Sequence, residues 1–500
     1  MEIKNIKSNS NINEVIIISY QLLPFRFERF NDREILLSNE VGEFAFVANS
    51  DFEKLVDHHL DPQSQTFLNL KSKQILTDTE VDPVIEMLAT KYRTKKSFLD
   101  NFTALHMVVP TLRCNSNCIY CQVSRKDVNA KDIDMDKATA KKVVNLIFQS
   151  PSPHIKIEFQ GGEPLLSFET VKYIIEYAEW CNIFKKKDLQ FVICTNLTLI
   201  TDKMLRYLKG HRVYISTSLD GPKGLHNRNR PLQETDNTYD VLVEKIKLCR
   251  KYLGDDSVSA LMTTSAFSLS SFKEIIDEYL RQGFNSIFLR SLNPYGFAKR
   301  DEYKIGYEIS DFIDAYKKAL DYIIDINIKG TYFLEGFAAL ILARILTPFS
   351  TGFVDMQSPA GVGISGVIYN YNGNVYVSDE ARMLASMGDD KFLMGNVHNA
   401  SYQELFNSDF MHSLIGSSCL ECLPACAQCG FQSYCGADPV RNYSEQGDII
   451  GHRLTSDECR KNKEIIKYIM GLIKLDDKDI NDVFWSWLTR RPMRKVKTAL

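Results

Sequence analysis

Three cysteines on one short segment are the residues of this chain best suited to metal chemistry. Cys114, Cys118 and Cys121 follow one another with the spacing C-x3-C-x2-C. Three thiolates can hold three irons of a [4Fe–4S] cube and leave the fourth iron open to a ligand. Zinc also accepts thiolates, but a structural zinc site is normally closed by a fourth ligand. Three unligated thiols are the remaining alternative, and the pattern favours the iron–sulfur cluster.

The elements that surround these cysteines predict an α/β fold. Apolar, β-rich runs alternate with helical stretches that carry apolar residues at helical spacing. The runs are 105–109, 155–159, 190–194, 213–219, 258–263 and 286–289. Six alternating strands predict a parallel sheet, and continuous apolar strands predict burial on both faces. We therefore expect a partial (β/α)6 barrel, with the active site at the C-terminal ends of its strands.

The cysteine triplet and the strand ends that follow it resemble the radical S-adenosylmethionine (SAM) superfamily. Tyr120 supplies the aromatic residue before the last cysteine, and Gly161-Gly162-Glu163-Pro164 matches the family's GGEP segment. The resemblance implies a [4Fe–4S] cluster whose open iron chelates SAM. It also implies the following SAM-facing residues: Gln160, Gly161, Gly162, Glu163, Thr195, Asn196, Ser218, Asp220 and Arg230.

The chemistry of these residues agrees with such a role. The two glycines permit close approach of the backbone, and Glu163 supplies negative charge for the methionine amino group of SAM. Arg230 suits the SAM carboxylate, because a guanidinium binds carboxylates strongly. An ordinary surface arginine is the alternative.

A second group of cysteines, near the C-terminus, resembles the auxiliary-cluster domain called SPASM, which occurs in radical SAM enzymes that modify peptides. The resemblance implies four ligands of one auxiliary [4Fe–4S] cluster: Cys426, Cys429, Cys435 and Cys459. A zinc ribbon is the alternative, since pairs of C-x2-C suit tetrahedral zinc. Cys419 and Cys422 could complete another site or be reactive thiols, and both possibilities stay open.

The chain also departs from the SPASM pattern. Where many such domains place cysteines for a second auxiliary cluster, this chain has Pro359, Ser378 and Pro439, so we expect one complete auxiliary cluster. Asp379 follows one of these positions, just beyond a hairpin whose Asn-Gly pair at 372–373 predicts a type I′ turn. In related sulfatase-maturing enzymes an aspartate at this place deprotonates the substrate, which implies the same role for Asp379. A solvated ion pair with Arg382 is the alternative.

The first hundred residues look like a separate unit of short strands followed by short helices. This order resembles the winged-helix-like module that peptide-maturing enzymes use to bind a leader peptide as an added strand. A structural appendage is the alternative. End to end, the chain is most similar to the radical SAM maturases of the His-Xaa-Ser type. That resemblance implies a ribosomal precursor peptide as substrate, a flavodoxin or ferredoxin as electron donor, and a second radical SAM protein as a candidate partner.

Composition limits the other partners. The net charge is −3, so no strong field favours nucleic acid or an anionic membrane surface. No run approaches the roughly 18 apolar residues of a membrane span, and no signal peptide is evident, so we expect a cytoplasmic protein with reduced thiols. We expect a recognition module at 1–95, a barrel at 96–335, a SPASM-type domain at 336–475 and a C-terminal tail at 476–500.

The function that follows is modification of a peptide by hydrogen abstraction with a 5′-deoxyadenosyl radical. The product would be a crosslink, an epimer or an oxidised residue. One alternative is formylglycine formation on a sulfatase. Another is a non-catalytic iron–sulfur or zinc scaffold that only binds a peptide.

Overall fold

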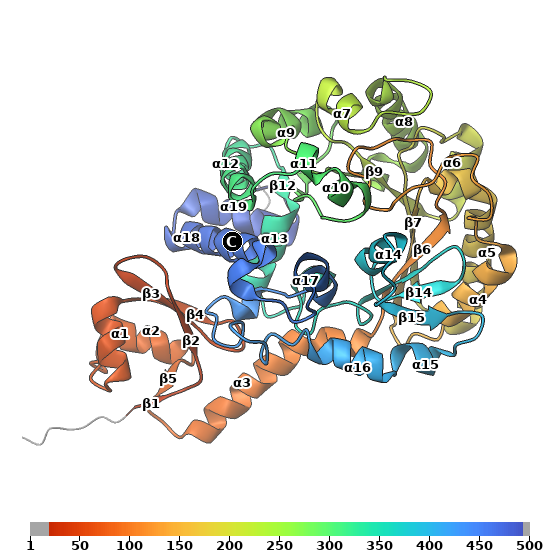
Figure 1. Cartoon of the computed structure of the whole chain (residues 1–500). Helices are drawn as coiled ribbons and strands as arrows, with labels where there is room; N and C mark the ends of the chain where they lie inside the picture. The colour runs from red at the N-terminus through yellow and green to blue at the C-terminus, as the bar shows by residue number, and fades with distance from the viewer. Residues whose placement is uncertain (1–19, 494–500) are drawn as a thin grey trace, which may run out of the picture. The chain divides into compact units, whose positions relative to one another are not determined.

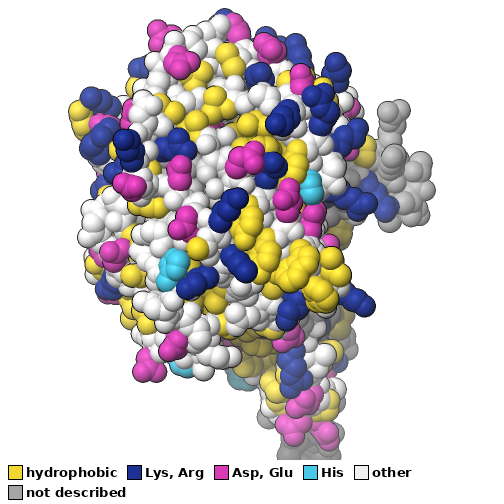
Figure 2. Space-filling view, turned by 90° about the vertical axis from the view of Figure 1, so that its right-hand side faces the viewer, with side chains coloured by type: hydrophobic (Ala, Val, Ile, Leu, Met, Phe, Trp, Pro, Cys, Tyr) yellow, Lys and Arg dark blue, Asp and Glu magenta, His cyan; other side chains and the backbone are white. Residues whose placement is uncertain are grey.

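The computed structural model describes residues 20–493. The chain divides into two compact units, residues 1–92 and 93–500, and the boundary lies inside helix α3 (Val81–Lys96) (Figure 1). Within the described residues, no helix is both long and apolar enough to cross a membrane. Acidic and basic side chains are interspersed on the face of the molecule in Figure 2, as the small net charge predicts.

The first unit contains a three-stranded antiparallel sheet followed by two helices. Its strands are β2 (Arg26–Arg29), β3 (Glu34–Ser38) and β4 (Phe44–Ala48), in that spatial order. The helices are α1 (Asn49–Val56) and α2 (Gln65–Ser72), and a short pair, β1 (Gln21–Leu22) with β5 (Leu76–Thr77), completes the unit. Leu37, Leu55 and Phe67 form part of one buried core, so the unit has an apolar interior of its own.

The second unit is built on an eight-stranded sheet. Five parallel strands lie in sequence order along it: β6 (Leu105–Thr111), β7 (His154–Gly161), β8 (Asp188–Cys194), β9 (Val213–Ser218) and β10 (Val258–Leu261). The helices that connect and follow them include α4 (Lys137–Ile147), α5 (Phe168–Lys185), α6 (Asp202–Gly210), α8 (Thr238–Leu253) and α9 (Phe272–Arg281). In Figure 1, α4, α5 and α6 cover the outer face of the sheet. Because all five strands run the same way, their C-terminal ends meet at one edge.

The sixth predicted strand does not join this sheet. Residues Ser286–Ile287 form β11, which pairs in parallel with β12 (Leu334–Glu335) in a sheet of two strands. The Glu335 carboxylate then accepts a hydrogen bond from the backbone N–H of Leu289 at 3.0 Å. A side chain therefore takes the place of a strand partner, and the ladder stops after two residues.

Three strands from the C-terminal half extend the sheet on its other side. β13 (Gly366–Tyr369) lies parallel to β6, and β14 (Asn374–Tyr376) and β15 (Leu393–Asn396) follow antiparallel. The predicted hairpin is present, but its turn is not type I′, because only Gly373 has a positive φ (83°). Gly373 donates its N–H to the carbonyl of Asn370 at 2.9 Å, so a four-residue turn ends in a left-handed glycine.

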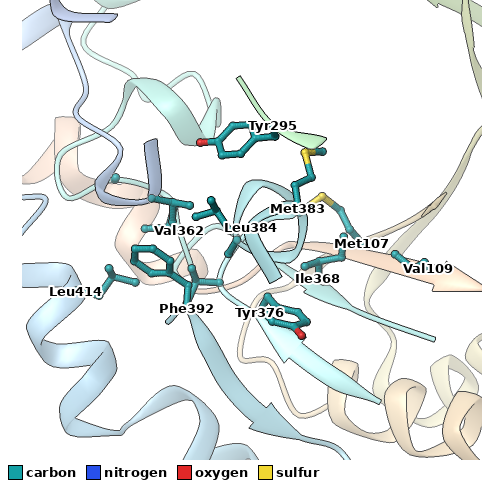
Figure 3. Packing of buried hydrophobic residues seen from close by; sticks show 14 of the residues in the cluster. Met107, Val109, Tyr295, Val362, Ile368, Tyr376, Met383, Leu384, Phe392 and Leu414 are labelled. Carbon is teal, nitrogen blue, oxygen red and sulfur yellow. The ribbon is translucent and has the colours of Figure 1, made fainter. Parts of the chain in front are cut away.

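A buried cluster fixes this extension to the first barrel strand. Met107 of β6, Ile368 of β13 and Tyr376 of β14 share it with Leu384 of helix α14 (Asp379–Ser386) and with Phe392, as Figure 3 shows. None of these five side chains is more than 6% exposed, so the cluster excludes water between the barrel and the C-terminal segment.

Part of the predicted tail is a packed helix. Residues 478–489 form α19 (Lys478–Thr489), which begins after Asp477, whose carboxylate accepts the N–H groups of Asp479 and Ile480. Trp487 is buried, and its indole N–H donates to the carbonyl of Phe333 at 3.0 Å. The helix contacts α12 (Ile309–Ile328) and α13 (Gly336–Leu346). The prediction of a tail from residue 476 was therefore wrong for this stretch, because an N-cap and an apolar face make it a helix.

Candidate active site

The cysteine triplet lies on the loop after β6 and lines a cavity of about 240 Å³ (the SAM cavity). Seven of the nine residues predicted to face SAM line the same cavity: Gly161, Gly162, Glu163, Thr195, Asn196, Ser218 and Arg230. The other two do not. Gln160 donates its amide to Glu158 at 2.7 Å, and Asp220 is fully buried beside Arg230. The strand ends therefore bring most of the predicted residues to one place.

The three thiols form a donor set that suits an iron–sulfur cluster. Burial raises the pKa of the Cys114 thiol, and the nearby Cys118 thiol raises it further; burial also raises the pKa of Cys118 to about 11. Such buried, mutually repelling thiols ionise when a metal cation binds them. Among residues 20–493 no three His, Cys, Asp or Glu side chains are arranged to hold a single metal ion. A cubane spreads its thiolates over separate irons, so its ligands need not converge on one point.

Glu163 ties two strand ends together. Its carboxylate is almost fully buried and accepts hydrogen bonds from the Leu165 N–H (3.0 Å), the Thr195 hydroxyl (2.7 Å) and the Asn196 N–H (2.9 Å). Burial raises the pKa of Glu163, and these hydrogen bonds partly oppose that shift. The sequence predicted Glu163 as a partner of SAM, and the structure adds that its carboxyl group joins the ends of β7 and β8.

The glycines before Glu163 allow close approach to the cysteine loop. A Cβ atom on Gly162 would lie 2.1 Å from the carbonyl oxygen of Arg113. The N–H of Gly162 donates to the Thr111 carbonyl at 2.9 Å, and the N–H of Glu163 donates to the Arg113 carbonyl at 2.7 Å. The two glycines therefore allow the end of β7 to pack closely against the backbone of the cysteine loop.

Asn196 also holds the cysteine loop. Its side-chain amide donates to Asn115 Oδ1 and to Ser116 Oγ, both at 2.9 Å. Asn115 in turn donates to the Thr198 hydroxyl at 2.8 Å. The contacts of Asn115 and Ser116 were missed from the sequence, because short polar residues between cysteines carry no distinctive signal.

A buried aspartate orients Arg230. Arg230 Nε donates to Asp220 Oδ1 at 3.1 Å, and the Tyr120 hydroxyl donates to the other oxygen of the same carboxylate. The guanidinium also lies 5.1 Å from the centre of the Tyr120 ring. Burial alone would lower the pKa of Arg230, but Asp220, Tyr120 and Cys118 together outweigh it and the pKa is raised. Arg230 is therefore a fixed cation at the wall of the SAM cavity.

The four C-terminal cysteines lie within electrostatic reach of one another. Burial raises the pKa of the Cys435 thiol, and Cys459, Cys429 and Cys426 raise it further, in that order. Buried Arg344 donates to the carbonyls of residues 434, 433 and 435 at 3.0, 3.1 and 3.3 Å and thereby shapes their loop. The sequence carried a signal for this residue, since a lone charge interrupts the apolar helix at 336–346.

Cys419 and Cys422 form one short turn, in which the N–H of Cys422 donates to the Cys419 carbonyl at 3.0 Å. Cys422 is exposed, whereas Cys419 is partly buried. None of the twelve cysteines, all of which lie within residues 20–493, forms a disulfide.

Two of the three residues that replace the second set of cluster cysteines, Ser378 and Pro439, begin helices. The Ser378 hydroxyl accepts the Ala381 N–H at 3.2 Å and caps α14. Pro439 occupies the first turn of helix α17 (Pro439–Gln446), which Asp438 caps by accepting the Val440 N–H at 2.8 Å. Serine, aspartate and first-turn proline are typical of helix N-termini, so the residues at these positions stabilise the starts of α14 and α17.

Asp379 is the first residue of α14 and is partly exposed. Arg382, its predicted ion-pair partner, donates instead to the Val123 carbonyl (3.4 and 3.5 Å) and to the Ser386 hydroxyl (3.2 Å). Met383 on the same helix lines the SAM cavity. Helix α14 therefore packs against the cysteine loop, a contact that local sequence patterns do not reveal.

Comparison with known proteins agrees with this fold. Residues 108–279 match the sequence profile of the radical SAM superfamily. The chain is 22% identical over 368 residues to a cysteine-type anaerobic sulfatase-maturating enzyme of Clostridium perfringens (strain 13 / Type A), covering 71% of this chain and 93% of that protein.

Two solved structures are similar in fold. The structure described as native anSMEcpe with bound AdoMet and Kp18Cys peptide matches with a TM-score of 0.62 and 20% sequence identity. The match covers 74% of this chain and 98% of that chain. Streptococcus suis SuiB bound to the precursor peptide SuiA matches with a TM-score of 0.52 and 13% sequence identity. The match covers 88% of this chain and 100% of that chain. These likenesses confirm the predicted α/β fold.

Proposed function

Because residues 108–279 are a radical SAM domain, we propose that this protein is a radical SAM enzyme that modifies a ribosomally made peptide. The observation that carries the proposal is the SAM cavity, which the three cysteines share with Glu163, Asn196 and Arg230. Bound at this place, a reduced [4Fe–4S] cluster would supply one electron for cleavage of SAM to methionine and a 5′-deoxyadenosyl radical.

The residues of the chain bind and orient in this reaction. Cys114, Cys118 and Cys121 would hold the cluster, and Arg230, fixed by Asp220, would bind the SAM carboxylate. Glu163, which joins the strand ends, would supply negative charge for the amino group of SAM. Such fixed positions matter because orientation decides which hydrogen the radical removes.

We assign one auxiliary [4Fe–4S] cluster to the C-terminal cysteines. The mutual effect of the four thiols on the pKa of Cys435, together with the loop held by Arg344, supports this assignment over isolated thiols. An auxiliary cluster would accept an electron from the substrate radical. Asp379 would accept the proton, as a base within reach of the peptide.

The electron donor is a further part of the proposal. A second cavity of about 520 Å³ is lined by Arg125, Arg228, Arg300 and Lys304 with one acidic residue, Asp301. Cys118 lines this basic groove as well as the SAM cavity. An acidic flavodoxin or ferredoxin that docks there by charge complementarity would bring its redox centre close to the cluster.

The peptide is proposed as substrate because relatives act on peptides or bind them, as the Kp18Cys and SuiA complexes illustrate. The first unit, with its own core, is the proposed site for the leader part of the precursor. Deleting residues 1–92 should weaken peptide affinity and spare slow SAM cleavage; unchanged affinity would leave the unit a structural role. A second radical SAM protein as partner and a cytoplasmic location, where thiols stay reduced, complete the proposal.

Formylglycine formation is the second candidate, because the sulfatase-maturating relative aligns with 71% of this chain. One experiment tests the shared chemistry and separates the two products. The reconstituted protein should form 5′-deoxyadenosine from SAM and dithionite under anaerobic conditions. Mass spectrometry of a co-expressed neighbouring peptide and of a sulfatase peptide then identifies the substrate. A protein that binds iron and peptide without forming deoxyadenosine would be a scaffold, and the enzymatic proposal would fail.

A further inference from the structure

A small cavity near helix α14 combines acidic and aromatic walls, and the proposed reaction does not use it. It measures about 60 Å³. Its characteristic side chains are Phe288, Phe337, Phe353, Asp355, Glu380 and Asp438. A space of this size holds a few heavy atoms, since one water needs roughly 10–15 Å³ by the same measure. We call it the acid cavity.

The cations around the acid cavity are mostly engaged elsewhere. Arg441 and Lys461 bind the Glu458 carboxylate at 3.2 and 2.7 Å, and Arg441 also binds Glu445 at 2.7 Å. Arg290 lies 3.9 Å from Glu380, and Lys461 and Arg441 also act electrostatically on Asp355 and Asp438, but Glu458 shares their charge. Within the described part of the chain, the three carboxyl groups therefore face more negative than positive charge.

A buried hydroxyl group in the same cavity lacks a partner. Tyr295 is fully buried and lines the acid cavity, and its hydroxyl makes no hydrogen bond to any described residue. Asp438 and Glu380 both act electrostatically on this phenol, so the hydroxyl lies near them. In Figure 3 the Tyr295 hydroxyl points away from Met383. A buried polar group without a partner in a roomy, polar cavity indicates that a ligand supplies one.

We propose that the acid cavity binds the primary ammonium group of a lysine-like side chain of the substrate; this rests on the proposed peptide-modifying function. An ammonium group is a compact cation with three donors, for which the lining carboxyl groups and the Tyr295 hydroxyl are candidate acceptors. The phenylalanines suit its aliphatic stem and its charge. A single metal ion fits less well, since no three acidic side chains of residues 20–493 are arranged to hold one.

The position of the cavity explains what such binding achieves. Glu380 faces the acid cavity and Met383 faces the SAM cavity, and the two residues lie three positions apart on α14. One helical turn rises about 5.4 Å. A side chain anchored in the acid cavity therefore places neighbouring peptide residues at the mouth of the SAM cavity, where the radical forms.

The probe for this site is n-butylammonium, with n-butanol as the neutral analogue and tetramethylammonium as a cation without N–H donors. The thermal midpoint of the reconstituted full-length protein should rise with n-butylammonium alone. Glu380→Gln keeps the shape of the side chain and should weaken this binding about tenfold or more, because a charge-assisted hydrogen bond is lost. Asp325→Asn, a surface carboxylate on α12 paired with Lys329, is the matched control and should bind as the parent does.

Equal shifts in Glu380→Gln and the parent, or no shift in the parent, would overturn the proposal. If Glu380→Gln does not fold, Asp438→Asn replaces it, because asparagine still caps α17. Deoxyadenosine formation is measured on the same preparations. Its absence from the parent would refute the proposed function, whereas normal deoxyadenosine without a response to n-butylammonium would refute the acid cavity alone.

Discussion

The substitution Glu163→Gln tests whether the buried carboxylate aligns the strand ends. The Glu163 carboxylate accepts three hydrogen bonds, two on Oε1 and one on Oε2. In glutamine, one of these positions becomes an NH2 group. It then faces the N–H of Leu165 or of Asn196, whichever way the amide turns. One buried N–H group is left without an acceptor, which costs about 1–3 kcal/mol.

That free energy predicts a measurable loss of activity. If this free energy is lost from the transition state of SAM cleavage, the rate falls roughly 5- to 150-fold, since about 1.4 kcal/mol corresponds to a tenfold change in rate. The assay is deoxyadenosine formation by the anaerobically reconstituted protein with dithionite, with saturating SAM and a matched iron content. The thermal midpoint should also fall, because the hydrogen bonds join β7 to β8 in the absence of SAM.

Two companion variants separate the causes. Thr195→Val keeps the Glu163 carboxylate but removes a hydroxyl that donates to Oε1 and also accepts the Leu197 N–H at 3.0 Å. One buried N–H group again loses its acceptor, so a loss of similar size is expected although the charge of Glu163 is kept. Glu404→Gln changes an exposed carboxylate at a helix capping box and should not alter SAM cleavage. If Glu163→Gln matches the parent in both rate and midpoint, the carboxylate does not align the strand ends.

Three further outcomes follow from the described residues. Replacing Cys114, Cys118 and Cys121 with Ala should abolish deoxyadenosine formation and reduce iron from about eight to about four per chain, and zinc in place of the remaining iron would contradict the auxiliary cluster. Asp379→Asn should keep SAM cleavage and reduce modified peptide about 10²–10⁴-fold, so a loss under tenfold would exclude Asp379 as the base. Burial lowers the pKa of His226 to about 4, against about 6.5 when unfolded. The unfolded chain therefore binds this proton first, and the free energy of unfolding should fall by about 3 kcal/mol between pH 6.5 and 4. Denaturant titrations at several pH values should show that the free energy of unfolding depends less on pH in His226→Asn than in the parent. An equal pH dependence in the two proteins would show that His226 is protonated when folded.

Local spacing carried the part of the site that could be predicted. The triplet at 114–121 and the Gly-Gly-Glu segment each follow an apolar strand, and parallel strands bring their ends to one edge. That is why Glu163, Asn196 and Ser218 line one cavity, whereas Arg230 reaches it from the end of helix α7 (Lys223–Asn229). Asp220 could be recognised as a strand-end residue, but its role in orienting Arg230 depends on side chains that meet only in the folded protein.

The features that were missed depend on contacts between distant segments. β13 pairs with β6 across more than 260 positions, a pairing that no local pattern encodes. The turn at 370–373 differs from the predicted type because Asn372 keeps an ordinary φ and only Gly373 becomes left-handed. Tyr295 and Arg344 likewise acquire their roles from neighbours far away in sequence.

The pairing of β13 with β6 makes the barrel and the auxiliary-cluster region a single cooperative structure. Residues 93–500 are one compact unit, and one continuous ladder of backbone hydrogen bonds runs from β10 to β15 through both predicted domains. Removing the chain after residue 335 would expose an edge of β6 and the apolar cluster beside it, which favours aggregation. The two cysteine-containing regions are therefore expected to unfold in one transition.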